Sequence, residues 1–229
     1  MKSDEFNNLI NDLSKCRKCT NFECSKKCLI NIFEDYDFCT SIPSIWTDWL
    51  NRLDSDIMII GQDWGPFCDM KKYHDMLNSD KSNWNEIIEL EKSNTKKMLE
   101  KYISESSKRK YSLNDMYITN AIMCGRSGEN YRGDNIDLIK STLNCSEFLL
   151  RQIDIVKPKV ILTLGYYPLI SLSKIFNFEI CKNLSETINN FPEFNVGDYI
   201  IIPLYHPVAQ VKRDEQLKQY NRIWKYVNL

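Results

Sequence analysis

The residues best suited to chemistry lie where apolar stretches of the sequence end. Asp63 follows the run DIMIIG, Asn120 follows MYIT, and His206 follows YIIIPLY. An acid, an amide and an imidazole together suit a reaction that uses water, reads a polar planar ring and stabilises a departing anion. Each residue also has an ordinary alternative, because Asp63 can cap a helix, Asn120 can close a turn and a lone His206 can be structural.

Four apolar runs predict the strands that position these residues. The runs cover residues 56–61, 115–124, 159–165 and 198–207, and helical patterns separate them at 82–110, 135–157 and 167–176, with a closing helix over 208–227. Alternating strands and helices predict an α/β fold, a three-layer α/β/α domain with a central, mostly parallel, four-stranded sheet. Because the carboxyl ends of parallel strands meet at one edge, the three chemical residues should converge there.

Length and composition are those of a globular protein. The chain has 229 residues, of which 43% are hydrophobic and 27% charged, and its formal net charge is −1. We expect one domain over 1–229, with a cysteine-rich N-terminal segment (1–50) packed on it and a helical insertion at 68–112. No apolar run is long enough to span a membrane and residues 1–16 do not resemble a signal peptide, so a cytoplasmic location is expected.

Nine cysteines in such a protein indicate metal binding rather than disulfides. On spacing alone, Cys16, Cys19, Cys24 and Cys28 form a compact candidate site for structural zinc.

Five stretches carry a resemblance to a known family: CRKC, IMIIGQDWGPF, YITNAIMCGR, NCSEFLLRQIDIVKPKVILTLG and IIPLYHP. Together they resemble the uracil-DNA glycosylase superfamily, and most closely its iron–sulfur family 4 branch. The resemblance implies a DNA glycosylase that hydrolyses the N-glycosidic bond of a flipped-out pyrimidine. Residues 68–112 have little counterpart in the family.

The resemblance also implies a ligand set for an iron–sulfur cluster of the 4Fe-4S type. Its ligands would be Cys16, Cys19, Cys124 and Cys145, with structural zinc as the alternative. Cys39, Cys68 and Cys181 are expected to be ordinary thiols.

Roles for the site residues follow from the same resemblance. Asp63 would handle water and stabilise the sugar cation, and His206 would donate to the departing base. Asn120 would pair with the edge of the base, while Phe67 would stack on it or, alternatively, pack in the core. The other substrate-binding residues of the first motif would be Gly61, Gln62, Trp64 and Gly65.

The sequence departs from the family pattern at the same motif. Family 4 carries its acid where this chain has Gln62, and the tyrosine that excludes a 5-methyl group in the classical enzymes is replaced by Gly65. The pocket could therefore admit a larger substituent at C5 of the base. The final motif ends in Val208 rather than serine, so other residues would have to bind the DNA phosphates. The candidates are Arg126, Arg132, Lys212 and Arg213; the alternative for each is an ordinary solvated charge.

The leading hypothesis is a monofunctional, monomeric glycosylase for uracil in single- or double-stranded DNA, acting in base excision repair. One alternative is a glycosylase for a C5-modified pyrimidine in phage DNA, which would serve defence. Another is a non-catalytic iron–sulfur protein that binds DNA.

Overall fold

The central element of the fold is a five-stranded sheet in the order β3-β2-β5-β7-β6. The computed structural model describes residues 1–19, 29–34, 49–67, 93–126 and 137–227. The four predicted strands are present as β2 (Ile57–Gly61), β3 (Tyr117–Asn120), β5 (Val160–Leu164) and β7 (Tyr199–Leu204), and all pair in parallel. The fifth strand, β6 (Phe194–Val196), was not predicted and pairs antiparallel with β7 at the sheet edge.

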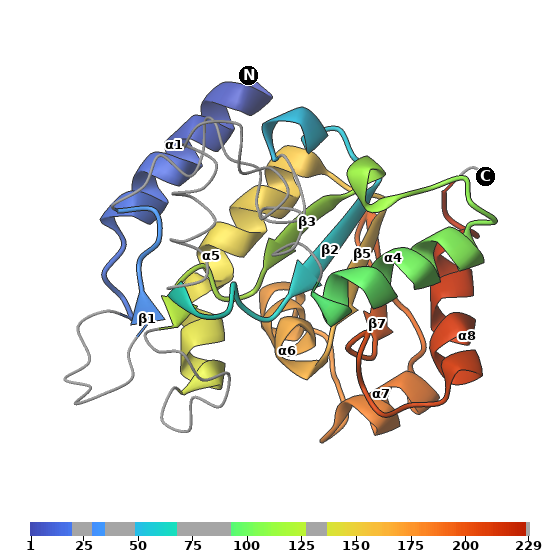
Figure 1. Cartoon of the computed structure of the whole chain (residues 1–229). Helices are drawn as coiled ribbons and strands as arrows, with labels where there is room; N and C mark the ends of the chain where they lie inside the picture. Colours follow the sequence, from blue (N-terminus) through green and yellow to red (C-terminus); the bar gives the residue numbers. More distant parts are fainter. Residues whose placement is uncertain (20–28, 35–48, 68–92, 127–136, 228–229) are drawn as a thin grey trace.

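Helices cover both faces of the sheet, so the predicted three-layer α/β/α architecture is confirmed (Figure 1). One layer holds α1 (Lys2–Lys15), α5 (Leu138–Val156) and α6 (Tyr166–Phe176). The other layer holds α4 (Asn94–Ser106) and α8 (Arg213–Ile223). Alternate residues of β2 face the two layers: Met58 and Ile60 pack with the first, Ile57 and Ile59 with the second.

Local signals set the helix boundaries. The side chain of Asp137 accepts a hydrogen bond from the Lys140 N–H and caps α5, while Lys157 ends it in the left-handed conformation just before Pro158. A short helix, α7 (Leu184–Asn190), lies between the predicted helix at 167–176 and β7, where no helix was predicted. Of the insertion expected at 68–112, the described part contains α4, and the 3-10 turn η3 (Leu113–Asp115) follows it; residues 68–92 lie outside the described residues.

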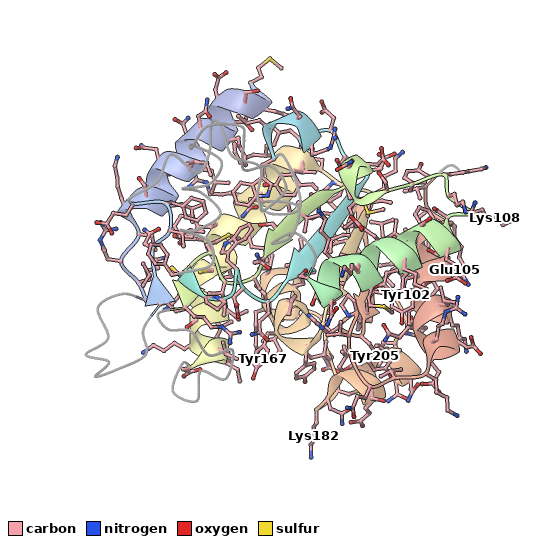
Figure 2. All side chains as sticks on the ribbon, in the orientation of Figure 1. Tyr102, Glu105, Lys108, Tyr167, Lys182 and Tyr205 are labelled. Atoms are coloured by element: carbon pink, nitrogen blue, oxygen red, sulfur yellow. The ribbon has the colours of Figure 1, made fainter. Side chains whose placement is uncertain are left out.

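Side chains of α4 join this helix to α8. Tyr102 stacks on Tyr220 with ring centroids 5.0 Å apart, and Glu105 forms an ion pair with Arg213; Tyr102 and Glu105 are labelled in Figure 2. The described part of this region, α4, is therefore integrated into the second helical layer. No described helix combines the length and apolar character needed to cross a membrane.

A small second sheet ties the N-terminal segment to the loop after β3. Its strands are β1 (Leu29–Ile30) and β4 (Gly125–Arg126), which pair antiparallel. Trp49, just before the 3-10 turn η1 (Leu50–Arg52), lies among the rings of Phe6, Phe33, Trp64 and Tyr117, and its indole N–H donates to the Ile118 carbonyl. The described part of the N-terminal segment thus packs on the sheet layer that carries the predicted site.

Candidate functional site

The turn after β2 lies alongside the segment after β3. In the parallel register, Gly61 pairs with Asn120. The carbonyls of Gly61, Gln62 and Gly65 accept backbone hydrogen bonds from Ala121, Ile122 and Arg126, at 2.8, 2.9 and 2.9 Å. The two segments therefore remain hydrogen-bonded beyond the strands, and the first two predicted motifs share one rim of the sheet.

Asp63 is the most tightly held side chain of this turn. Its Oδ2 accepts hydrogen bonds from Gln62 Nε2 at 2.8 Å and from Arg126 Nε at 3.0 Å, together with a second Arg126 nitrogen. Its Oδ1 accepts from the Gly65 N–H at 2.8 Å. The side chains of Asp63 and Arg126 are 5% and 14% exposed, so this is a largely buried ion pair. These contacts are with a neighbouring amide, a turn N–H and a guanidinium, so Asp63 does not act as the helix cap considered above.

Two glycines have positional reasons in this turn. A Cβ on Gly61 would lie 2.4 Å from Asn120 Oδ1, so the absence of a side chain lets the amide pack against the backbone of β2. Gly65 has a φ of 81°, in the left-handed region that side chains disfavour. The backbone conformation of the turn therefore requires glycine at position 65. That Gly65 also admits a larger substituent at C5 of the base stays a prediction.

The aromatic residues of the first motif point toward protein. Trp64 packs with its ring centroid 5.4 Å from that of Trp49, and its indole nitrogen is buried with no hydrogen-bond partner among the described residues. Phe67 is partly buried against the core, and its Cβ lies near Gly125. These contacts agree with the packing alternative for Phe67, whereas substrate contact for either residue stays a prediction.

His206 lies on the same edge of the sheet, just after β7. Strand β5 separates β7 from β2, so about 10 Å lies between their ends, from the usual strand spacing. The preceding Tyr205, labelled in Figure 2, donates to Ser185 of α7 at 3.2 Å. The His206 side chain is exposed, yet the protein around it removes part of its hydration and lowers the pKa of its imidazole.

The basic residues predicted to bind phosphate have different surroundings. Arg126 lies against Asp63, and Arg213 forms its ion pair with Glu105 across α4 and α8. Lys212 precedes α8 and is exposed. Arg132 lies outside the described residues. Of the described candidates, Lys212 has the surroundings most compatible with an unobstructed phosphate contact.

Four cysteines lie in one region, after the end of α1, after β3 and in the first half of α5. Cys19, Cys124 and Cys145 are buried, Cys16 is half-buried, and none of the four forms a disulfide. The Cys145 thiol donates to Cys19, which lowers the pKa of Cys19 to about 6. Burial, together with the charges of Cys19 and Cys16, raises the pKa of Cys124 to about 12. These mutual effects indicate that the four sulfur atoms share one region.

The donor chemistry of this region fits a thiolate-bound metal group. Asn144 Nδ2 donates to Cys19 Sγ at 3.4 Å, an interaction of the kind that stabilises a thiolate ligand. No set of three or more described His, Cys, Asp or Glu side chains stands at metal-binding geometry. Cys24 and Cys28, the remaining members of the compact zinc alternative, lie outside the described residues.

Comparison with known sequences decides the family. A family model described as the uracil DNA glycosylase superfamily matches residues 47–228, which is most of the chain.

The chain belongs to the uracil DNA glycosylase superfamily.

A curated member of this superfamily resembles part of the chain. A type-4 uracil-DNA glycosylase from Saccharolobus solfataricus is 33% identical over 100 residues. The match covers 43% of this chain and 44% of the relative, so the chain aligns with less than half of that protein. The family 4 resemblance recognised in the sequence is thereby confirmed.

Within this superfamily fold, the predicted residues occupy one edge of the sheet. Gly61 and Asn120 pair directly, Asp63 lies in the turn two residues after Gly61, and His206 follows another strand that ends at the same edge. Sequence reasoning missed the pairing of Arg126 with Asp63, which it had treated as a phosphate ligand. The sequence did contain one indication of this pairing. Arg126 follows Asn120 in the loop after β3, and that loop runs beside the turn after β2 that carries Asp63.

Proposed function

We propose that this chain is a DNA glycosylase that hydrolyses the N-glycosidic bond of a flipped-out pyrimidine, with uracil as its base, and leaves an abasic site. The observation that carries the proposal is the packing of Asn120 onto Gly61 beside the buried carboxylate of Asp63. It puts an amide and an acid, the groups for base reading and water handling, at the ends of adjacent strands. The superfamily match and the type-4 relative support the reaction class.

Each residue then acts on a different part of the nucleotide. Base flipping brings the pyrimidine to the rim, where Asn120 offers both a donor and an acceptor to its polar edge. His206, whose lowered pKa favours the neutral imidazole, donates an N–H to the base oxygen as negative charge develops. A donor of this kind contributes roughly 3–4 kcal/mol to the lowering of the barrier. Asp63 supplies the acid of the site and organises the groups that hold the water.

A 4Fe-4S cluster bound by Cys16, Cys19, Cys124 and Cys145 is part of the proposal. Four thiolates are its usual ligand shell, and the mutual interactions of these thiols support this ligand set. Bound there, the cluster would act structurally, because its ligands come from the end of α1, the loop after β3 and the first turns of α5. It would thus fix the loop that carries Arg126.

Phosphate binding is proposed for Lys212, with Arg132 and Arg213 as further candidates. Lys212 follows the His206 loop directly and is exposed. For Arg213, contact with DNA would have to compete with its ion pair to Glu105. Such contacts set the position of the duplex without reading its sequence.

A panel of single- and double-stranded oligonucleotides tests the proposal. One set carries uracil and matched sets carry thymine or cytosine with larger C5 substituents, and release of free base is measured by chromatography. We expect uracil release by the wild-type protein and its loss in Asp63→Asn and His206→Ala. Release of only a C5-modified base would show that this base, and not uracil, is the substrate. DNA binding without release of any base would overturn the enzymatic function.

A further inference from the structure

The carboxylate of Asp63 has little accessible acceptor capacity for a water molecule. A carboxylate offers about four lone-pair sites. Here Oδ2 accepts from Gln62 and from two nitrogens of Arg126, and Oδ1 accepts from Gly65. Oδ1 keeps one lone-pair site, but the side chain is only 5% exposed, so solvent has little access to that site. A more accessible neighbour is therefore better placed to touch the attacking water.

The same network fixes the side chain of Gln62. A carboxylate paired with a guanidinium only accepts hydrogen bonds, so the NH₂ end of the Gln62 amide must face Asp63, as its 2.8 Å contact shows. Oε1 then occupies the opposite position of the planar amide. Within the described part of the chain, no group donates to this oxygen, and the side chain is half-buried. The amide thus holds an oriented acceptor with capacity for a water.

Gln62 also stands at the correct place for that contact. It follows Gly61, whose backbone packs against Asn120 Oδ1, and its own carbonyl is held by the Ile122 N–H. The backbone at Gln62 is therefore fixed beside the proposed base-reading amide, and the side chain is fixed by Asp63. A water held by Gln62 would lie close to the sugar of a base that is bound to Asn120.

We propose that Gln62 Oε1 holds the attacking water and that Asp63 and Arg126 are positioning residues that orient its amide. This rests on the proposed glycosylase function. In the reaction, the bond between C1′ and the base nitrogen breaks and its electron pair leaves with the base. The oxygen of water forms a bond to C1′, and its surplus proton passes to the departing base anion or to solvent.

Arginine suits the supporting position better than lysine does. Its planar guanidinium donates from two nitrogens to the same Asp63 oxygen, which leaves that oxygen one direction for Gln62. A lysine at this position could keep the charge but not the fork. The proposal thus assigns Arg126 to the carboxylate and not to the DNA backbone.

The experiment compares variants in single-turnover cleavage of uracil DNA and in binding of an uncleavable 2′-fluorinated analogue. Gln62→Leu keeps the approximate volume of the side chain and removes the acceptor; we expect its cleavage rate to fall about 100-fold, as for loss of one pre-organised hydrogen bond. Its dissociation constant for the analogue should change by less than about threefold, because ground-state binding is not involved. Asn11→Leu, at an exposed position of α1, is the matched control and should cleave at the wild-type rate.

Arg126 supplies the second readout. Arg126→Met should lower the cleavage rate with little effect on analogue binding, and Arg126→Lys should recover part of the loss. Wild-type cleavage by Gln62→Leu, or equal weakening of analogue binding and cleavage in Arg126→Met, would overturn this inference alone. Absence of base release by the wild-type protein would instead overturn the proposed function, and the inference with it.

Discussion

Arg126 donates from two nitrogens to one oxygen of Asp63, although the two residues are 63 positions apart in the sequence. The pair is largely buried, and the carboxylate also holds Gln62 and the backbone of Gly65. Removing either partner would leave an uncompensated charge inside the protein. The turn after β2 consequently depends on a residue of the loop after β3, both for its shape and for its charge balance.

This dependence should appear in stability. We expect Asp63→Asn to lower the free energy of unfolding by about 3 kcal/mol, because a buried partner is left unpaired. The double variant Asp63→Asn with Arg126→Met should lose less than the sum of the single losses. Urea denaturation of the four proteins measures the coupling. Additive losses would contradict the buried pair, and Asp56→Asn, in the exposed pair with Lys159, is the control, with an expected loss of less than about 1 kcal/mol.

Gly61→Ala should impair activity more than stability. The added Cβ would displace Asn120 Oδ1, the end of a side chain that can rotate away at little energetic cost. We expect base release to fall about as far as in Asn120→Ala, and Gly61→Ala should add little further loss in the Asn120→Ala background. Cleavage kinetics of the single and double variants measure this.

The opposite pattern is expected for Gly197→Ala, the control for this prediction. Gly197 has a φ of 57° with open space around it, so alanine there should cost about 1 kcal/mol of stability and no activity. Full activity of Gly61→Ala would show that base release does not depend on the packing of Asn120 against the backbone of β2.

The lowered pKa of His206 sets a direction for the effect of pH. Because the folded protein disfavours the imidazolium, the unfolded chain binds more protons as the pH falls through the ordinary value of about 6.5. The free energy of unfolding of the wild-type protein should therefore decrease as the pH falls through this range. The decrease should be smaller in His206→Gln, which lacks the imidazole. A neutral donor also predicts that cleavage by the wild-type protein persists somewhat below pH 6.5. An activity loss centred above that pH would contradict the neutral imidazole.

Trp64 allows a test of packing against substrate contact. Its indole N–H is buried and has no hydrogen-bond partner among the described residues, so Trp64→Phe removes an unsatisfied donor while it keeps a ring beside Trp49. We expect the free energy of unfolding to change by less than about 1 kcal/mol, since these two effects oppose each other. Unchanged base release would assign Trp64 to the core; selective loss of activity would place the residue in contact with substrate.

The cysteine region predicts a link between metal content and activity. Cys124 lies two residues before Arg126, so Cys124→Ala should lower iron and sulfide content and also slow base release. Circular dichroism should still show the helices and strands, because the central sheet packs through its own core clusters. Cys181→Ala, at a cysteine near α7, should keep its iron. Zinc in a colourless wild-type protein would reject the iron–sulfur assignment.

The parts of the fold that sequence could predict are those with a long apolar pattern. Strands β2 and β5 are continuous buried runs, and α5 has both a cap at Asp137 and a stop at Pro158. Strand β6 escaped prediction because three residues at a sheet edge, none of them buried, leave no periodic pattern. Helix α7 escaped because only Thr187 and Ile188 of its seven residues are buried.

The candidate site divides in the same way. Asp63, Asn120 and His206 could be proposed because strand ends are recognisable in sequence and the sheet gathers them at one edge. The partner of Asp63 could not, because an ion pair between distant loops has no local pattern, and Arg126 looked like any basic residue of a turn-rich segment. The likewise distant contact between Gly61 and Asn120 required the strand register.

The two-residue strand β4 has a consequence for the order in which the protein assembles. Gly125 and Arg126 pair with Leu29–Ile30 on one side, and Arg126 bridges to Pro66 on the other. Closing both connections brings together three segments that are far apart along the chain, which costs loop entropy and comes late in folding. We therefore expect a chain with a finished sheet but an unfinished rim to be inert, so that the proposed release of bases from DNA would begin only after the last folding step.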